Sequence, residues 1–157
     1  MVGKKLPNYL IINTRDERVN LHDFIGKKEL VIILLRSKYC PFSRAHLRKL
    51  AKDIKKFREL DVELIPILQD NKRNTIKVEE QFTQNKIRIY YDVKREIGKV
   101  FNQEINMLKL GRIPAMFIID KNGTIIYAYY SDTMDDIPNN TEIFDFLWNL
   151  KKYHPIF

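Results

Sequence analysis

The apolar run Leu30–Leu35, which ends five residues before a Cys-Pro pair, limits the possible folds of this chain more than any other feature. A short unbroken apolar run is typical of a strand covered on both faces of a sheet. From Pro41 to Leu60, apolar residues recur every three or four positions, which predicts an amphipathic helix with proline in its first turn. A doubly buried strand followed by such a helix indicates an α/β fold.

The middle of the chain alternates between strands and helices. We expect a strand, a helix, a strand and a short helix, in that order, at Val62–Leu68, Asn74–Gln84, Ile87–Tyr91 and Lys94–Asn102. A strand–helix–strand unit of this kind pairs its strands in parallel through a right-handed crossover. No repeat or Pro/Gly-rich linker divides the sequence, and 157 residues suffice for one core, so we expect one domain over residues 1–157.

The C-terminal part predicts a hairpin and a closing helix. The apolar runs Ala115–Ile119 and Thr124–Tyr130 flank Asn122-Gly123, and an Asn-Gly pair favours a tight hairpin because both residues tolerate positive φ. We expect the last helix over Thr141–Lys151, with Thr141 as its N-cap. Its inward face is predicted to carry Ile143, Phe144, Leu147, Trp148 and Leu150.

Cys40 lies where the buried strand gives way to the helix. Free backbone N–H groups and the positive end of the helix dipole stabilise a thiolate there, and the thiolate is the nucleophile of thiol chemistry. At helical spacing Ser43 and Arg44 lie on the same side, where Ser43 can donate a hydrogen bond to the sulfur and Arg44 can add positive charge. The alternative is a small buried hydrophobe, as most free cysteines are. The basic surroundings and the helix start favour the reactive thiol.

Composition narrows the mechanism. Cys40 is the one cysteine of the chain, so no intramolecular disulfide is possible and a redox cycle must end on an external thiol or on a second copy. A net charge of +8 arises from 28 basic residues interspersed with 20 acidic ones, which disfavours nucleic acid as a partner. The histidines His22, His46 and His154 form no ligand pattern, so we expect neither a metal nor another cofactor.

Localisation follows from hydropathy. No stretch approaches the ~20 apolar residues of a membrane span, and the apolar patch Tyr9–Ile12 is too short for a signal peptide. We therefore expect a cytoplasmic protein with no membrane partner. The strand tyrosines Tyr127, Tyr129 and Tyr130 are expected to serve either packing or a homodimer surface.

Several motifs occur in a characteristic order. They are Val19–Lys27, the strand that ends at Arg36, Tyr39–Phe42, and Ile113–Asp120 with Asn122-Gly123. Together, from residue 5 to residue 150, they resemble the peroxiredoxin group of the thioredoxin superfamily, the alkyl hydroperoxide reductases and thiol-specific antioxidant proteins. The resemblance implies a thioredoxin-like α/β fold with a central mixed sheet flanked by helices.

The same resemblance implies roles for single residues. Cys40 takes the position of the cysteine that attacks the peroxide, and Ser37 that of the Thr or Ser three residues before it. Pro114 matches the cis-proline opposite the cysteine, which with Pro41 and the backbone of Ile113 is expected to bind an extended thiol substrate. An ordinary strand-start proline is the alternative for Pro114.

The chain departs from the family pattern at three positions. Ser43 stands where dithiol members carry a second cysteine, so thioredoxin-type dithiol exchange is excluded. Ile33 replaces the usual proline seven residues before the cysteine, and Pro114 stands in place of the arginine at the start of the late strand. Arg112 and Arg44 are the two candidates to replace that arginine.

Three functions are consistent with these residues. The leading hypothesis is a one-cysteine peroxidase that reduces hydroperoxides through Cys40 and is recycled by an external thiol. The second is a monothiol protein that exchanges disulfides without peroxide. The third is an interaction module that kept the fold without catalysis, since fold does not fix function.

Overall fold

The structure is a computed structural model that describes residues 2–101, 115–130 and 138–153. Its strands form one seven-stranded sheet in the order β2-β1-β5-β4-β3-β6-β7. The strands are β1 (Leu10–Asn13), β2 (Arg18–Asn20), β3 (Glu29–Leu35), β4 (Val62–Leu68), β5 (Tyr90–Tyr91), β6 (Ala115–Ile119) and β7 (Ile125–Tyr130). The helices are the 3-10 helix η1 (Leu21–Phe24), α1 (Pro41–Lys52), α2 (Ile54–Glu59), α3 (Lys72–Thr83), α4 (Ile97–Val100) and α5 (Asn140–Tyr153). Within these ranges no helix is long and apolar enough to cross a membrane.

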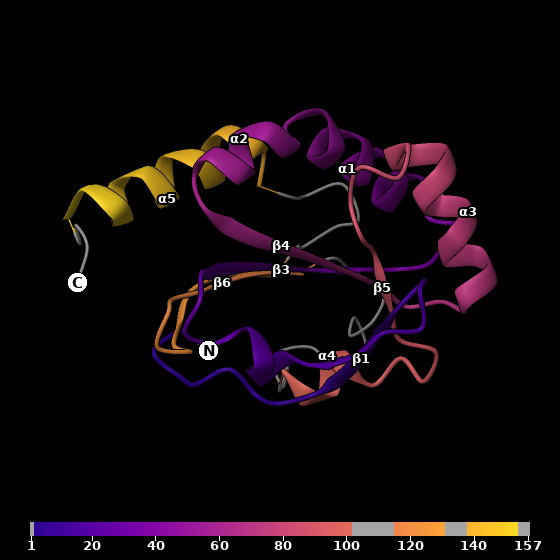
Figure 1. Ribbon diagram of the computed structural model, residues 1–157, viewed down its shortest axis with the longest axis horizontal. Helices are drawn as coiled ribbons and strands as arrows, with labels where there is room; N and C mark the ends of the chain where they lie inside the picture. Colours follow the sequence, from indigo (N-terminus) through magenta and orange to yellow (C-terminus); the bar gives the residue numbers. More distant parts are fainter. Residues whose placement is uncertain (1, 102–114, 131–137, 154–157) are drawn as a thin grey trace.

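Strand β3 is the centre of the sheet, as its apolar run predicts. All seven of its residues are buried, and it pairs in parallel with β4 and antiparallel with β6. Alternate side chains enter two separate cores: Val31, Ile33 and Leu35 in one, and Leu30, Ile32 and Leu34 in the other. Helices α1, α2, α3 and α5 cover the first core, whereas η1 and α4 lie on the second (Figure 1).

The single helix predicted over Pro41–Leu60 is two helices. Helix α1 ends at Lys52, Asp53 leaves helical geometry with φ −104° and ψ 15°, and α2 begins at Ile54. The Asn140 side-chain amide, at the start of α5, donates to the Lys49 carbonyl and to the Asp53 carboxylate, each at 2.9 Å. A carbonyl at the end of α1 is thereby satisfied from another helix. The apolar period continues through Asp53, so it could not reveal the break.

Two predicted elements are shorter than expected. The strand expected over Ile87–Tyr91 forms only at Tyr90–Tyr91. Ahead of it, the left-handed residues Gln84 and Asn85, with φ of 48° and 59°, turn the chain after α3. This short strand does pair in parallel with β4, as predicted. Similarly, the helix expected over Lys94–Asn102 is described at Ile97–Val100 alone, and Asn102 lies outside the described residues.

The predicted hairpin of β6 and β7 is confirmed, with a different turn. Gly123 has φ 81°, whereas Asn122 is not among the residues with positive φ. The Gly123 N–H donates to the Asp120 carbonyl at 3.0 Å, and the Asn122 and Thr124 N–H groups donate to the Asp120 carboxylate, each at 2.9 Å. Asp120 therefore organises the turn, and the sheet register shifts by a bulge between Ile118 and Ile119.

Helix α5 begins one residue earlier than predicted. Asn139, rather than Thr141, caps it by accepting the Glu142 N–H at 2.9 Å. Of the predicted inward face, Ile143 and Leu147 are buried, but Trp148 is 63% exposed, so its inward placement was wrong. Trp148 directly follows Leu147 along the chain, and a one-residue step of about 100° turns it off the buried stripe.

His46 is a buried polar residue in the interior face of α1. It is 2% exposed, and among the described residues neither ring nitrogen has a hydrogen-bond partner. Burial, with a smaller contribution from Lys49, lowers the pKa of His46 from 6.5 to about 4. The imidazole is therefore neutral at pH 7.

We expect His46→Leu to raise the free energy of unfolding by about 1–3 kcal/mol at pH 7, because it removes buried polar atoms that lack partners. Since the pKa of His46 is depressed in the folded state, the unfolded chain binds more protons between about pH 4 and 6.5. Wild-type stability should fall as pH decreases through that window, by roughly 3 kcal/mol, and the variant should lack this fall.

Urea unfolding of both proteins at pH 7 and pH 4.5 measures the effect. His22 is the matched control, because its Nε2 already has a partner at 2.7 Å in the Leu6 carbonyl, so His22→Leu should give no gain. An identical pH dependence in wild type and His46→Leu would contradict the assignment.

Candidate active site at Cys40

Cys40 is the N-cap residue of α1. Its backbone is extended, with φ −80° and ψ 111°, and Pro41 occupies the first helical position. A four-residue loop, Arg36 to Tyr39, joins it to the end of β3, and the Cys40 N–H donates to the Ser37 carbonyl at 3.1 Å. Cys40 is 4% exposed.

Hydrogen-bond donors and one cation surround the sulfur. Hydrogen bonding from the Ser43 hydroxyl and from the backbone N–H groups of Ser43 and Phe42 lowers the pKa of the Cys40 thiol. The Arg36 guanidinium places Nη1 4.0 Å from Sγ. Burial by itself raises the pKa of the Cys40 thiol, but these donors and the Arg36 charge outweigh burial and hold the pKa below its usual value. The site therefore favours a thiolate.

The two candidates on α1 lie in different places. Ser43 is 1% exposed, and its hydroxyl oxygen accepts the Arg36 N–H at 3.1 Å, so it connects the loop to the sulfur. The Arg44 guanidinium lies over the Phe82 ring of α3, 5.4 Å from its centroid, next to that of Arg48 at 4.6 Å. Among the described side chains, Arg36 is the cation whose charge lowers the Cys40 pKa, and the part of Arg44 in the chemistry stays a prediction.

The remaining sequence candidates divide into two groups. Ser37 accepts the Tyr39 N–H with its hydroxyl oxygen at 3.3 Å, and Pro41 begins α1. Arg112, Ile113 and Pro114 lie outside the described residues. The roles expected of all five therefore stay predictions.

Arg36 was not predicted from the sequence as a site residue. The available signal was its spacing, since Arg36 ends the apolar run four residues before Cys40. Helical spacing from Cys40 instead predicted Arg44 as the nearby cation, because side chains at positions i and i+4 share a helix face. Cys40, however, precedes the helix as its N-cap residue. The loop between β3 and Cys40 folds so that the Arg36 side chain lies beside the sulfur.

A second missed feature fixes that loop. Gln69 and Asp70 follow the end of β4, the parallel neighbour of β3. The Gln69 side-chain amide donates to the Leu35 carbonyl at 3.0 Å, and the Gln69 backbone N–H donates to the Arg36 carbonyl at 2.8 Å. Asp70 accepts the Lys38 N–H at 2.9 Å. The carboxyl ends of neighbouring parallel strands meet at one edge of a sheet, so residues that follow β3 and β4 lie close together. This rule was the signal that could have predicted the contact.

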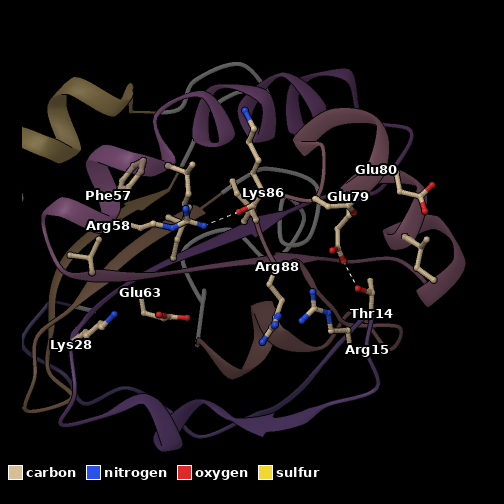
Figure 2. Close-up of a pocket in the computed structure, with 16 residues that line it drawn as sticks. Thr14, Arg15, Lys28, Phe57, Arg58, Glu63, Glu79, Glu80, Lys86 and Arg88 are labelled. Carbon is tan, nitrogen blue, oxygen red and sulfur yellow. Dashed lines mark hydrogen bonds between the residues drawn. The ribbon is translucent and has the colours of Figure 1, made fainter.

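A groove of about 730 Å³ lies at the opposite end of the sheet, at the start of β4 (Figure 2). Two of its basic side chains have partners: Arg58 donates to the Lys86 carbonyl at 3.3 Å, and Arg88 pairs with Glu17 at 3.5 Å. The Glu79 carboxylate accepts a hydrogen bond from the Thr14 hydroxyl. In the part of the chain that the structure covers, no group of three or more His, Cys, Asp or Glu residues gathers as a metal site.

A family comparison decides what kind of protein carries this site. The model of the AhpC/TSA family matches residues 2–128, which include Cys40 and the loop that holds it. The chain belongs to the AhpC/TSA family. As the sequence motifs predicted, this is a peroxiredoxin-like member of the thioredoxin superfamily.

Relatives of this AhpC/TSA protein support the assignment. The Trieres chinensis protein ycf42, which is named as a peroxiredoxin, is 25% identical over 136 residues, covering 80% of this chain and 65% of that protein's length. The mitochondrial 2-Cys peroxiredoxin of Plasmodium falciparum superposes with a TM-score of 0.79 at 23% identity, over 98% of this chain and 96% of that one. A yeast mitochondrial 1-Cys peroxiredoxin gives 0.82 at 17% identity, over 98% and 78%. The predicted thioredoxin-like α/β fold is confirmed.

Proposed function

We propose that this AhpC/TSA protein is a one-cysteine thiol peroxidase that reduces hydroperoxides. The observation that carries the proposal is the Arg36 guanidinium 4.0 Å from the Cys40 sulfur at the start of α1, where hydrogen bonding from Ser43 and Phe42 also lowers the thiol pKa. A thiolate needs both features: it attacks as the anion, and the cation offsets negative charge that develops as the peroxide breaks. Family membership adds independent support.

The reaction begins with attack of the Cys40 thiolate on the terminal oxygen of the hydroperoxide. An S–O bond forms as the O–O bond breaks, so sulfur is oxidised to sulfenic acid while the peroxide is reduced. The departing oxygen leaves as an alkoxide or hydroxide and takes up a proton to become an alcohol or water. Arg36 is the cation placed to stabilise that charge, beside the sequence candidates Arg112 and Arg44.

Recycling requires a thiol from another molecule, since the chain has one cysteine. An external thiol condenses with the sulfenic acid to give a mixed disulfide and water, and a second thiol then releases Cys40 as it forms a disulfide with the first. The yeast 1-Cys relative has its thiol resolved by glutathione and thioredoxin systems. A disulfide between two copies through Cys40 is the other route of recycling.

We further propose that the chain is a single domain that acts in the cytoplasm without a cofactor.

Monothiol exchange is the second candidate, favoured by Ser43 in the Cys-Pro-Phe-Ser sequence. A thiolate with no second cysteine attacks a mixed disulfide and carries the incoming group itself. Peroxide is not needed for this reaction. The two functions share Cys40 and differ in what oxidises it.

Hydrogen peroxide and cumene hydroperoxide consumption with excess dithiothreitol separates them. A peroxidase consumes both, and Cys40→Ser should abolish the protein-dependent rate. If the wild type leaves both peroxides unconsumed but exchanges readily with glutathione-mixed disulfides, the peroxidase proposal fails and monothiol exchange replaces it.

A further inference from the structure

Asp70 connects the Cys40 loop to the start of helix α3. It lies two residues beyond the end of β4 and is 7% exposed. One carboxylate oxygen accepts the Lys38 N–H at 2.9 Å. The other accepts the Asn71 N–H and the Asn74 side-chain amide, each at 2.8 Å. A buried carboxylate with three donors is strongly fixed, because charged hydrogen bonds are short and about twice as strong as neutral ones.

The loop that Asp70 fixes carries the cation of the site. Lys38 is two residues from both Arg36 and Cys40, and the turn between them is closed by the Cys40 N–H on the Ser37 carbonyl at 3.1 Å. Gln69 holds the first part of the loop through its bonds to the carbonyls of Leu35 and Arg36. The later part of the loop is held through the Lys38 N–H, which donates to the carboxylate of Asp70, a residue outside the loop.

We propose that Asp70 is a positioning residue that acts through the Lys38 backbone to keep Arg36 and the Cys40 sulfur in reactive geometry. Asp70 does not touch the sulfur, so it is not itself catalytic. The inference rests on the proposed function, because it concerns the reactivity of Cys40. Asn74 supports it from α3 by holding the second carboxylate oxygen.

The direction of the effect separates positioning from charge. A carboxylate that acted on the thiol by its charge alone would raise the thiol pKa, so its removal would lower that pKa. A positioning carboxylate has the opposite effect. Without it the loop relaxes, the Arg36 guanidinium moves from Sγ, and the thiol pKa rises.

Iodoacetamide alkylation of Cys40 as a function of pH measures this without peroxide. For Asp70→Ala we expect the midpoint to rise by about one pH unit, which is about a tenfold smaller thiolate fraction below the midpoint. Asp70→Asn, with one acceptor oxygen instead of two, cannot serve all three donors and should shift the midpoint by less. It also provides a folded protein if the alanine variant is too unstable.

Asp92 provides the matched control. This carboxylate is 6% exposed and accepts two hydrogen bonds at 2.9 Å, from the Tyr9 hydroxyl and the Ile97 N–H, after the neighbouring strand β5. Asp92→Ala should lower the melting temperature but leave the alkylation midpoint unchanged. A midpoint that is unshifted or lowered in every folded Asp70 variant overturns the inference. Because alkylation needs no peroxide, a raised midpoint in a protein that consumes none would defeat the peroxidase proposal alone.

Discussion

Replacing Arg36 with methionine should lower the second-order rate constant for peroxide by about 10²–10³-fold, the usual cost of losing one preorganised contact to developing negative charge. Arg36 Nη1 lies 4.0 Å from Sγ, and its charge also lowers the pKa of Cys40. The rate constant of the variant therefore falls for two reasons: the thiolate fraction near neutral pH is smaller, and the leaving oxygen is less well stabilised. Stopped-flow measurement of hydrogen peroxide consumption between pH 6 and 9 separates the two losses, since only the first recovers at high pH.

Arg48→Met is the matched control for that experiment. Arg48 lies on α1 over the Phe82 ring, 4.6 Å from its centroid, so its removal takes a positive charge from the helix that follows Cys40 but not from beside the sulfur. The rate constant should stay close to that of the wild type. If instead Arg36→Met retains the wild-type rate while Arg44→Met or Arg112→Ala loses it, the family arginine has been replaced by one of those residues and our assignment of Arg36 is wrong.

Ser43→Cys should turn a chain that cannot form an internal disulfide into one that does. Ser43 is 1% exposed and lies near enough to the Cys40 sulfur for its hydroxyl to lower the thiol pKa, so a thiol at position 43 begins close to Sγ. After peroxide treatment we expect a disulfide between Cys40 and the new thiol, because sulfenic acid condenses with a neighbouring thiol. Mass spectrometry under non-reducing conditions should show a monomer lacking two hydrogens. We also expect the variant, but not the wild type, to reduce insulin.

Ser43→Ala serves as the comparison, since it removes the same hydroxyl without adding a thiol. It should form no internal disulfide, and its Cys40 should have a raised pKa because one donor to the sulfur is lost. If the oxidised Ser43→Cys protein contains two free thiols or only intermolecular disulfides, the first turn of α1 does not hold the geometry described here.

The sequence predicts the centre of this fold well because burial there is extreme. The run Leu30–Leu35 and the run Val62–Leu68 are covered on both faces, and both became strands at nearly their predicted limits. Prediction failed where a contact from a distant part of the chain decides the backbone. Asn140 reaches across to Asp53 at the break between α1 and α2, and no local period shows such a contact.

The candidate site shows the same division. Cys40 and Ser43 could be predicted because one short segment, the start of a helix, brings them together. Arg36 and Asp70 reach the site through a loop and a neighbouring strand, so their part depends on the parallel pairing of β3 with β4. The spacing of residues along the sequence cannot show the pairing of β3 with β4. The order of the strands in the sheet does show it.

The most direct test is to identify what one equivalent of hydrogen peroxide does to Cys40 in the reduced wild-type protein. Because the chain has no second cysteine, the sulfenic acid should persist or pair with another copy. We predict a dimedone-reactive monomer modified at Cys40, or a Cys40-linked dimer on non-reducing gels, formed within the time in which the peroxide is consumed. A protein whose Cys40 remains a free thiol, unlabelled by dimedone and monomeric, after the peroxide has been left in contact with it would contradict the account.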